Sequence, residues 1–191
     1  MFTTALNFLV TTVLNLLTML FLLRFILQLV RAPFNNPLAQ MVVSLTNFAV
    51  KPVRKVLPSW GKFDLSTLFL AIITQFLLQM CLVWLRDFPL SVAGQSVWMG
   101  IIGMSLLGVL RTCLDVFFYA LLLQVILSWV NPHSPISSAL DSLTKPILGP
   151  IQRVLPMASG IDFSPIVALI FLQMINVSVI KTLESQLLAL F

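Results

Sequence analysis

Long apolar runs without charged side chains constrain this sequence more than any other feature. The first 23 residues contain no Asp, Glu, Lys or Arg. A helix of about 20 apolar residues, rising roughly 1.5 Å per residue, crosses the hydrocarbon core of a bilayer, which is about 30 Å thick. The apolar runs predict four spanning helices, at about residues 3–30, 65–85, 108–130 and 163–183.

The composition is typical of a chain surrounded largely by lipid. Of the 191 residues, 59% are hydrophobic and 9% are charged, whereas roughly a quarter of the residues in a soluble domain are charged. So few polar groups do not cover a water-exposed surface. The composition therefore excludes a soluble globular enzyme, a disordered tail and a disulfide-rich secreted module, and it predicts an all-α membrane protein.

An internal repeat organises the chain. With a shift of 98 positions, Ser-Leu-Thr at 44–46 recurs at 142–144, and Val-Leu-Pro at 56–58 recurs at 154–156. Upstream, the shift is 100 positions, because two residues are deleted from the second copy. So many matches in register are not expected by chance. The chain is therefore two tandem copies, residues 1–96 and 97–191, each with two spanning helices.

Each copy also carries a short amphipathic helix in the proline-containing loop between its spans, at residues 37–50 and 135–148. Apolar and polar side chains there fall on opposite faces at helical spacing. About 14 residues reach only about 20 Å, too short to span the bilayer. We expect these helices to lie along the interface or to re-enter it, engaging lipid or a partner, or else merely to cover the ends of the bundle.

Proline and capping residues predict where these short helices begin and end. Asn36-Pro37 and Ser134-Pro135 each supply an N-cap followed by proline at the first helical position. Pro52 and Pro150 then stop or restart the helix.

Residues 97–107 are apolar as well, and they form either an interfacial helix that leads into the third span or a fifth span. A fifth span would reverse the second copy. The charge pattern favours four spans, because basic residues are concentrated in the two proline loops, which the positive-inside rule places in the cytoplasm with both termini outside. The candidate lipid or partner contacts in these loops are Arg31, Lys51, Arg54, Lys55, Lys145 and Arg153.

Two aspartates, Asp64 and Asp162, come directly before spanning helices. Carboxylates accept hydrogen bonds from the free N–H groups at a helix start and complement its dipole. We interpret both as helix caps, with ion binding as the alternative.

Polar residues inside the apolar runs need a reason, because charges in the membrane are costly. Arg24 snorkels to the headgroups or faces inward to an acidic partner. Arg111 and Asp115, at i and i+4, pair on one helix face. Gln75 and Gln173 occupy matching positions in the two copies, so they either pack helices together or line a shared central path.

The sequence gives no support for metal or redox chemistry. Cys81 and Cys113 lie apart in apolar runs, and His133 is the single histidine. We expect buried free thiols, no cofactor, no catalytic site and no nucleic-acid binding.

The twin motif Leu-Thr-x5-Pro-x3-Val-Leu-Pro, followed by Asp-x-Ser, and Leu-Ser-Trp-Val-Asn-Pro at 127–132 resemble the YggT/YlmG family. The first copy departs at residues 28–31 and lacks the Gly-Pro pair at 149–150. The resemblance implies a multi-pass protein of the bacterial inner membrane, with relatives in thylakoids, linked to osmotic tolerance, ion homeostasis and, in plastids, cytochrome haem assembly. It implies no catalytic residues.

Two functions follow from these observations. The first is a non-enzymatic scaffold or assembly factor that engages membrane lipids or partner proteins through its two cytoplasmic hairpins and forms a homo-oligomer or joins another membrane protein. The alternative is a small channel or transporter for monovalent cations in osmotic adaptation.

Overall fold

The computed structural model describes residues 2–85, 94–131, 134–155 and 162–188, and the regular elements in these ranges are helices. Four helices are long and apolar enough to cross a membrane. The prediction of an all-α membrane protein with about four spans is therefore confirmed. In chain order the helices are α1 (Phe2–Leu29), α2 (Pro37–Arg54), α3 (Leu65–Leu85), α4 (Gln95–Val130), α5 (Ser137–Val154), α6 (Ser164–Met174), a π-helical segment (Ile175–Ile180) and α7 (Lys181–Leu188).

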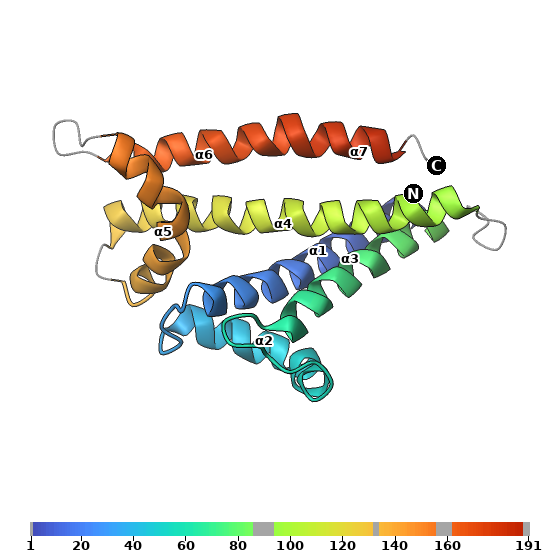
Figure 1. The fold of residues 1–191 in the computed structure, drawn as a ribbon, viewed down its shortest axis with the longest axis horizontal. Coiled ribbons are helices and arrows are strands. Elements are labelled where there is room, and N and C mark those ends of the chain that lie inside the picture. Colours follow the sequence, from blue (N-terminus) through green and yellow to red (C-terminus); the bar gives the residue numbers. More distant parts are fainter. Residues whose placement is uncertain (1, 86–93, 132–133, 156–161, 189–191) are drawn as a thin grey trace.

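The two copies point the same way (Figure 1). Helices α1 and α4 run from the end of the bundle that holds the termini to the opposite end, where α2 and α5 lie. Helix α3 and the continuous rod from α6 to α7 return the chain. Hence both short helices sit at one end of the bundle, and the corresponding helices of the two copies run in the same direction.

The third spanning helix is much longer than predicted. Helix α4 has 36 residues and measures about 54 Å. Residues 97–107 are its first turns, so they are neither a separate interfacial helix nor a fifth span. These turns are held because Val97 and Ile101 pack in a buried cluster with Val83 of α3.

The short helix α2 begins where the sequence predicts. The Asn36 side chain accepts a hydrogen bond from the N–H of Ala39 (2.8 Å), and Pro37 is the first helical residue. Its predicted end is wrong, because the helix continues through Pro52 to Arg54. A proline in the last turn removes only one backbone hydrogen bond, so the helix need not stop there.

Helix α5 differs from the prediction at both ends. It begins at Ser137 without a side-chain cap, two residues later than expected, and Ser134 instead accepts a hydrogen bond from the N–H of Ile136 (3.4 Å). Both Pro146 and Pro150 lie inside the helix, which ends at Val154.

The core lies where the two copies meet. Its main cluster joins Leu22 and Leu27 of α1, Val116 of α4, and Leu140 and Leu143 of α5. A smaller cluster, Leu121, Leu148, Ala168 and Leu172, joins α4, α5 and α6. The core thus packs the short helices α2 and α5 against the first spans, α1 and α4, and it holds the two copies together.

Candidate functional site

The side chain of Arg24 joins the first span, α1, to α2 through hydrogen bonds. This side chain is buried, and Nη1 donates hydrogen bonds to Thr46 Oγ1 (2.7 Å), Asn47 Oδ1 (3.1 Å) and the main-chain oxygen of Val43 (3.4 Å). Of the two roles expected for Arg24, snorkelling to the headgroups is therefore wrong. The other expectation, an inward-facing side chain, is right, but the hydrogen-bond acceptors are neutral oxygens rather than an acidic partner. Helix α2 folds back against α1 and places these oxygens within reach.

A second contact closes the same hairpin. Arg54, at the end of α2, forms an ion pair with the fully buried carboxylate of Asp64, just before α3. The main-chain oxygen of Asp64 accepts from the Thr67 hydroxyl (2.9 Å) and from the N–H of Leu68 (3.2 Å). The Asp64 carboxylate thus serves as a counter-ion rather than as the side-chain cap that the sequence predicts, because Arg54 reaches it.

In the second copy glutamine occupies both arginine positions, and the acceptor of the first contact is Asp141, at the position of Val43, rather than the counterparts of Thr46 and Asn47. Gln124, the counterpart of Arg24, donates to Asp141 Oδ1 (2.7 Å), and Gln152, the counterpart of Arg54, donates to Asp162 Oδ2 (2.9 Å). We call the two segments that these contacts hold the elbows: residues 37–64 in the first copy, and residues 135–155 with Asp162 in the second. Each elbow is thus held by two side chains, one near its start and one near its end. The donors occupy equivalent positions of the two copies, which are 100 positions apart at the start and 98 at the end.

Asp162 also caps the helix that follows. Its Oδ1 accepts a hydrogen bond from the N–H of Ser164 (2.9 Å) at the start of α6. Hydrogen bonding to Ser164, with a smaller contribution from Gln152, holds the pKa of the Asp162 carboxyl below its usual range.

The basic residues predicted to meet lipid or a partner are not equivalent in the structure. Arg54 is engaged by Asp64. Within the described residues, the remaining five make no ion pair, and their side chains are exposed: Arg31, Lys51, Lys55, Lys145 and Arg153. His133 and Pro156, which the sequence analysis considered in these loops, lie outside the described residues.

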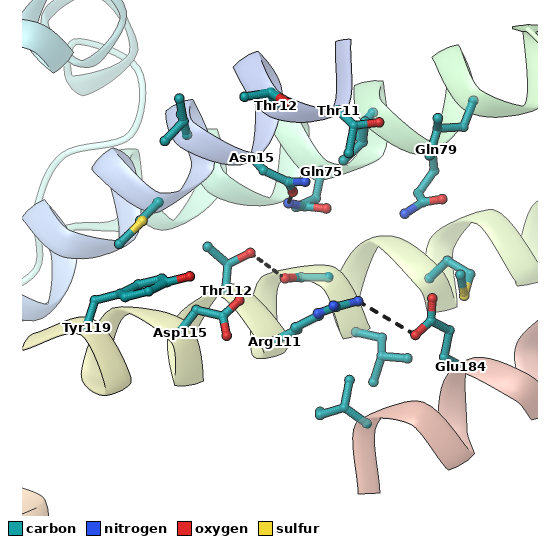
Figure 2. A pocket seen from close by; sticks show the side chains of 18 residues that line it. Thr11, Thr12, Asn15, Gln75, Gln79, Arg111, Thr112, Asp115, Tyr119 and Glu184 are labelled. Carbon is teal, nitrogen blue, oxygen red and sulfur yellow. Dashed lines mark hydrogen bonds and ion pairs between the residues drawn. The ribbon is translucent and has the colours of Figure 1, made fainter. Parts of the chain in front are cut away.

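A cavity of about 590 Å³, with both polar and apolar side chains in its walls, lies between α1, α3, α4 and α7 (Figure 2). At its edge Gln75 is buried and donates to Asn15 Oδ1 (2.9 Å) and Thr18 Oγ1 (3.3 Å). Gly108 of α4 allows this approach, because a Cβ there would overlap the amide oxygen of Gln75. The polar residues that line the cavity are Thr11, Thr12, Asn15, Gln75, Gln79, Arg111, Thr112, Asp115, Tyr119 and Glu184.

The charged residues of the cavity are arranged differently from the prediction. Arg111 and Asp115 form no ion pair with each other. Arg111 Nη1 lies 3.8 Å from Glu184 Oε2 of α7, and Asp115 Oδ1 accepts a hydrogen bond from Asn176 (3.2 Å). The C-terminal rod supplies these partners, and it is distant in sequence.

The cavity lies at the interface between the two copies. Thr11, Thr12 and Asn15 on α1 correspond, 100 positions on, to Arg111, Thr112 and Asp115 on α4, and all six line it. Figure 2 shows the two sets on opposite walls. Asn15, Gln75 and Arg111 also stand near the middle of their helices, so the cavity is near the centre of the spanning region.

The proposed shared path through Gln75 and Gln173 does not exist in the structure. Gln173 is exposed and lies beside Met174 and Val177 on the outer face of the C-terminal rod. Helix α3 packs against both α1 and α4, whereas α6 lies against α4 and α5. Matching positions in the two copies therefore have different surroundings.

The chain matches the CCB3/YggT family model over residues 3–85 and 103–183. It belongs to the CCB3/YggT family. Its relatives include the uncharacterized protein PA0392 of Pseudomonas aeruginosa, 38% identical over 184 residues (95% of this chain and 91% of the relative). The uncharacterized protein YggT of Escherichia coli K12 is 37% identical over 182 residues (94% and 92%). No solved structure matches the chain.

The two CCB3/YggT matches correspond to the two copies. A further relative, the uncharacterized protein ycf19 of Galdieria sulphuraria, is 34% identical over 83 residues, which are 42% of this chain and 81% of the relative. The first match covers the three helices α1 to α3, and the second covers most of α4 and continues into α7. The cavity is therefore the place where two CCB3/YggT units meet.

Sequence reasoning missed several cavity residues, including Thr112, Tyr119 and Glu184. The repeat contained a usable signal. Arg111 and Asp115 have the polar counterparts Thr11 and Asn15, and polar residues at matching positions of two spans indicate that the spans face each other there.

Proposed function

We propose that this protein is a non-enzymatic scaffold of the bacterial inner membrane, linked to osmotic tolerance, which engages lipid at the cytoplasmic surface through its first elbow. The observation that carries the proposal is the exposed apolar face of α2. One face of this helix is exposed and the other is buried against the bundle, and the short helix of the second copy has no such exposed apolar face.

The outward face of α2 carries an apolar stripe. Met41, Leu45 and Phe48 follow one another at i, i+4 and i+7, with Leu45 48% and Phe48 69% exposed. The opposite face, with Val42 and Val50, is buried against the bundle. An exposed apolar stripe on a helix at the end of a bundle is well solvated by the boundary between lipid headgroups and acyl chains.

The residues that follow α2 extend this surface. Trp60 is 83% exposed and Val56 is exposed as well, and tryptophan is enriched at membrane interfaces. Lys51 and Lys55 are exposed nearby. Cations beside an apolar stripe suit anionic lipid headgroups.

The second elbow lacks the apolar stripe on its helix, although Val154, the counterpart of Val56, is exposed as well. The counterparts of Met41, Leu45 and Phe48 are Ala139, Leu143 and Pro146, and Leu143 is 1% exposed within the core. We therefore assign lipid contact to the first elbow and a structural role to the second.

Fluorescence quenching tests the proposal. A variant with Trp60 as the only tryptophan, reconstituted with lipids brominated near the headgroup, is expected to be strongly quenched. In cells, Phe48→Glu is expected to reduce growth at high osmolarity at unchanged protein level, whereas Ser44→Glu, at an exposed polar position of the same helix, is the matched control. An unquenched Trp60, or normal growth with Phe48→Glu, contradicts the proposal.

We also propose that the protein acts as a homo-oligomer or with another membrane protein. The spans expose large apolar side chains such as Phe8, Phe69 and Phe171, which suit either lipid or a neighbouring helix. Crosslinking in native membranes, with the captured species identified by mass, distinguishes a second copy from another protein, and capture of lipid alone contradicts this part.

The second candidate function is transport of a monovalent cation. It is favoured by the cavity near the centre of the spanning region, since transporters place their sites at the interface of structural repeats near the bilayer midplane. Liposomes containing the purified protein are expected to take up sodium or potassium faster than empty liposomes under a gradient. Equal rates overturn this candidate.

A further inference from the structure

We propose that a second copy of this chain packs against the outer face of the C-terminal rod, in a two-fold symmetric dimer centred on Gln173. The inference rests on the proposed function, which includes a homo-oligomer, and it adds the face and the residue that join the two copies. A shallow groove marks this face. We call it the outer groove, and it is lined by Ile170, Gln173, Met174, Val177 and Ser178.

Gln173 lies too deep in its span to reach water. It stands nine residues after Ser164, the first residue of the span Ser164–Leu188, which corresponds to about 14 Å along the helix axis. The hydrocarbon core of a bilayer is about 30 Å thick, so this depth is near its middle. A glutamine side chain is shorter than the lysine and arginine side chains that snorkel to the headgroups.

The carboxamide of Gln173 has no partner within the part of the chain that the structure describes. Its side chain is exposed and makes no hydrogen bond there. The other polar side chain of the outer groove is satisfied, because the Ser178 hydroxyl donates to the main-chain oxygen of Met174. An amide in hydrocarbon without a hydrogen bond is costly, and acyl chains carry neither donors nor acceptors. Lipid alone therefore does not satisfy Gln173.

The first copy shows what a carboxamide at this position binds. Gln75, the equivalent of Gln173, is buried and donates to Asn15 Oδ1 (2.9 Å) and Thr18 Oγ1 (3.3 Å) of the neighbouring span. Hydrogen bonds of this kind join helices inside a membrane. The partner of the amide at this depth is thus a polar side chain on another helix.

The second copy does not offer Gln173 the same acceptors. The counterparts of Asn15 and Thr18 are Asp115 and Phe118. Asn176 already donates to Asp115 Oδ1 (3.2 Å), and a phenylalanine side chain has no oxygen. Gln173 consequently faces away from α4, and a helix outside this chain has to supply its partner.

A second copy supplies a partner at the correct depth. A carboxamide donates through its nitrogen and accepts through its oxygen, so two Gln173 side chains hydrogen-bond to each other. In a dimer with its two-fold axis along the membrane normal, equivalent residues lie at equal depth, and residues near the axis meet their own counterparts. The match in depth and chemistry is therefore built into the symmetry, whereas another protein would need a polar group at this level by separate design.

The side chains around Gln173 suit a packed helix pair. Ile166, Ile170, Gln173 and Val177 follow one another at i, i+4, i+7 and i+11, which is the spacing of the seam between two helices in a left-handed pair. The three apolar members are exposed by 50%, 57% and 49%, respectively. Ser178 adds a small side chain that lets a second backbone approach.

A dimer through the rod leaves the first elbow free. Figure 1 shows the rod from α6 to α7 on one side of the molecule and α2 on the opposite side. Helix α6 packs against α4 and α5 of its own chain. Each copy in the dimer therefore still presents the apolar stripe of α2, and association does not compete with lipid contact there.

Disulfide crosslinking in native membranes tests the face. In the full-length protein with Cys81 and Cys113 replaced by alanine, we expect Ile170→Cys and Val177→Cys to give, with an oxidant, a product of twice the chain mass that contains this chain alone. Phe171→Cys is the matched control, because it is exposed beside Ile170 but lies outside the outer groove, and it should stay monomeric. Equal crosslinking of Phe171→Cys, no crosslinking in the groove, or a product that contains a different protein overturns the proposal.

Energy transfer between labelled copies in liposomes tests the role of the amide. Dilution with lipid gives an apparent Kd for association, and Gln173→Leu should raise this Kd about tenfold, because it removes the hydrogen bonds and keeps the bulk of the side chain. Gln186→Leu, an exposed glutamine near the end of the rod, should leave the Kd unchanged. Association of Gln173→Leu as tight as that of the unmodified protein, or equal weakening by both variants, overturns the inference.

The outcome is separable from that of the lipid contact. Quenching of Trp60 by brominated lipid does not depend on association, so a monomer with quenched Trp60 overturns the dimer and leaves the lipid proposal standing. A dimer through the outer groove with unquenched Trp60 supports the dimer and contradicts the lipid contact. Crosslinking of two copies through another face only overturns the assignment to Gln173 but keeps the homo-oligomer.

Discussion

Arg54 forms an ion pair with the fully buried carboxylate of Asp64 and thereby joins the last turn of α2 to the start of α3. The equivalent positions of the second copy, Gln152 and Asp162, are joined by a hydrogen bond of 2.9 Å. The second copy therefore keeps the contact between the end of its short helix and the start of the next span, but glutamine replaces the charged arginine.

Removing Arg54 should destabilise the protein because it leaves the buried carboxylate of Asp64 without a counter-ion. Arg54→Ala is expected to lower the free energy of unfolding by roughly 2–3 kcal/mol, toward the lower end for a broken buried pair because Arg54 itself is half-exposed. Arg54→Gln should cost less, since glutamine fills this position in the second copy. Denaturant unfolding in mixed micelles measures both, with exposed Lys51→Ala as the control. Equal losses for all three variants would contradict the role of the pair.

Arg24 should control how firmly α2 is attached to the bundle. Arg24→Met removes the hydrogen bonds to Thr46 and Asn47, and hydrogen bonds from a charged donor contribute roughly 1.5–3 kcal/mol. Hydrogen exchange across residues 37–54 should therefore accelerate while exchange in α5 stays unchanged. Gln124→Met is the matched variant, and it should accelerate α5 instead. Uniform acceleration of both helices would indicate global loss of structure and would contradict the local role.

A methyl group at Gly108 should be harmful although alanine favours helices. The added Cβ overlaps the amide oxygen of Gln75, so this buried side chain must shift, which weakens its hydrogen bonds to Asn15 and Thr18. We expect Gly108→Ala to destabilise by about 1–3 kcal/mol, the typical cost of overpacking. Gly149→Ala, with nothing within 4 Å of the new Cβ outside its chain neighbours, should change the stability much less, because the helix propensity that alanine adds is offset by its contact with the ring of Pro150. In a Gln75→Ala background the penalty at Gly108 should largely disappear, which a double-mutant cycle of unfolding free energies measures.

The second elbow should weaken in acid. Because the pKa of Asp162 in the folded protein is lowered, the ionised carboxylate stabilises the fold above its ordinary pKa of about 3.9, and this stability is lost as the pH falls through the folded-state value. Local unfolding at the start of α6, followed by hydrogen exchange from pH 5 downward, should show this loss. Asp162→Asn should remove the pH dependence, and Gln152→Ala should reduce it. A pH profile unchanged in Asp162→Asn would show that another group is responsible.

Both elbows should be accessible from the same side of the membrane. With Cys81 and Cys113 replaced by alanine, Lys51→Cys in α2 and Arg153→Cys in α5 each place a thiol at an exposed position of the short helices at one end of the bundle. A membrane-impermeant thiol reagent should label neither in intact cells and both after lysis, in keeping with the positive-inside rule. Labelling of one position alone in intact cells would mean that the copies have opposite orientations.

The sequence predicts those parts of this molecule that depend on local pattern. The four spans follow from apolar length, and the start of α2 follows from Asn36-Pro37, because a cap and a first-turn proline act within a few residues. The partners of Arg24, Asp64 and Arg111 were not predictable in this way. Each is chosen by packing between segments distant in the chain, and a lone sequence does not say which of several polar groups comes nearest.

The cavity shows where a usable pattern was overlooked and where none existed. Thr11 and Asn15 match Arg111 and Asp115 across the repeat, so two facing polar walls were readable in principle. Glu184, in contrast, reaches the cavity only because the rod from α6 to α7 follows α4 along its length. No spacing rule reports such an alignment, which depends on how the long helices pack.

The two walls of the cavity carry different side chains, Thr11 and Asn15 on α1 against Arg111 and Asp115 on α4. In a symmetric dimer of identical hairpins, every substitution occurs in both subunits, so each new ionic group is present twice. In a single chain that contains both hairpins, a substitution affects only one of them. One half is free to evolve an ionic surface while the other keeps neutral hydroxyl and amide groups, and the number of charges that the bilayer must tolerate is halved.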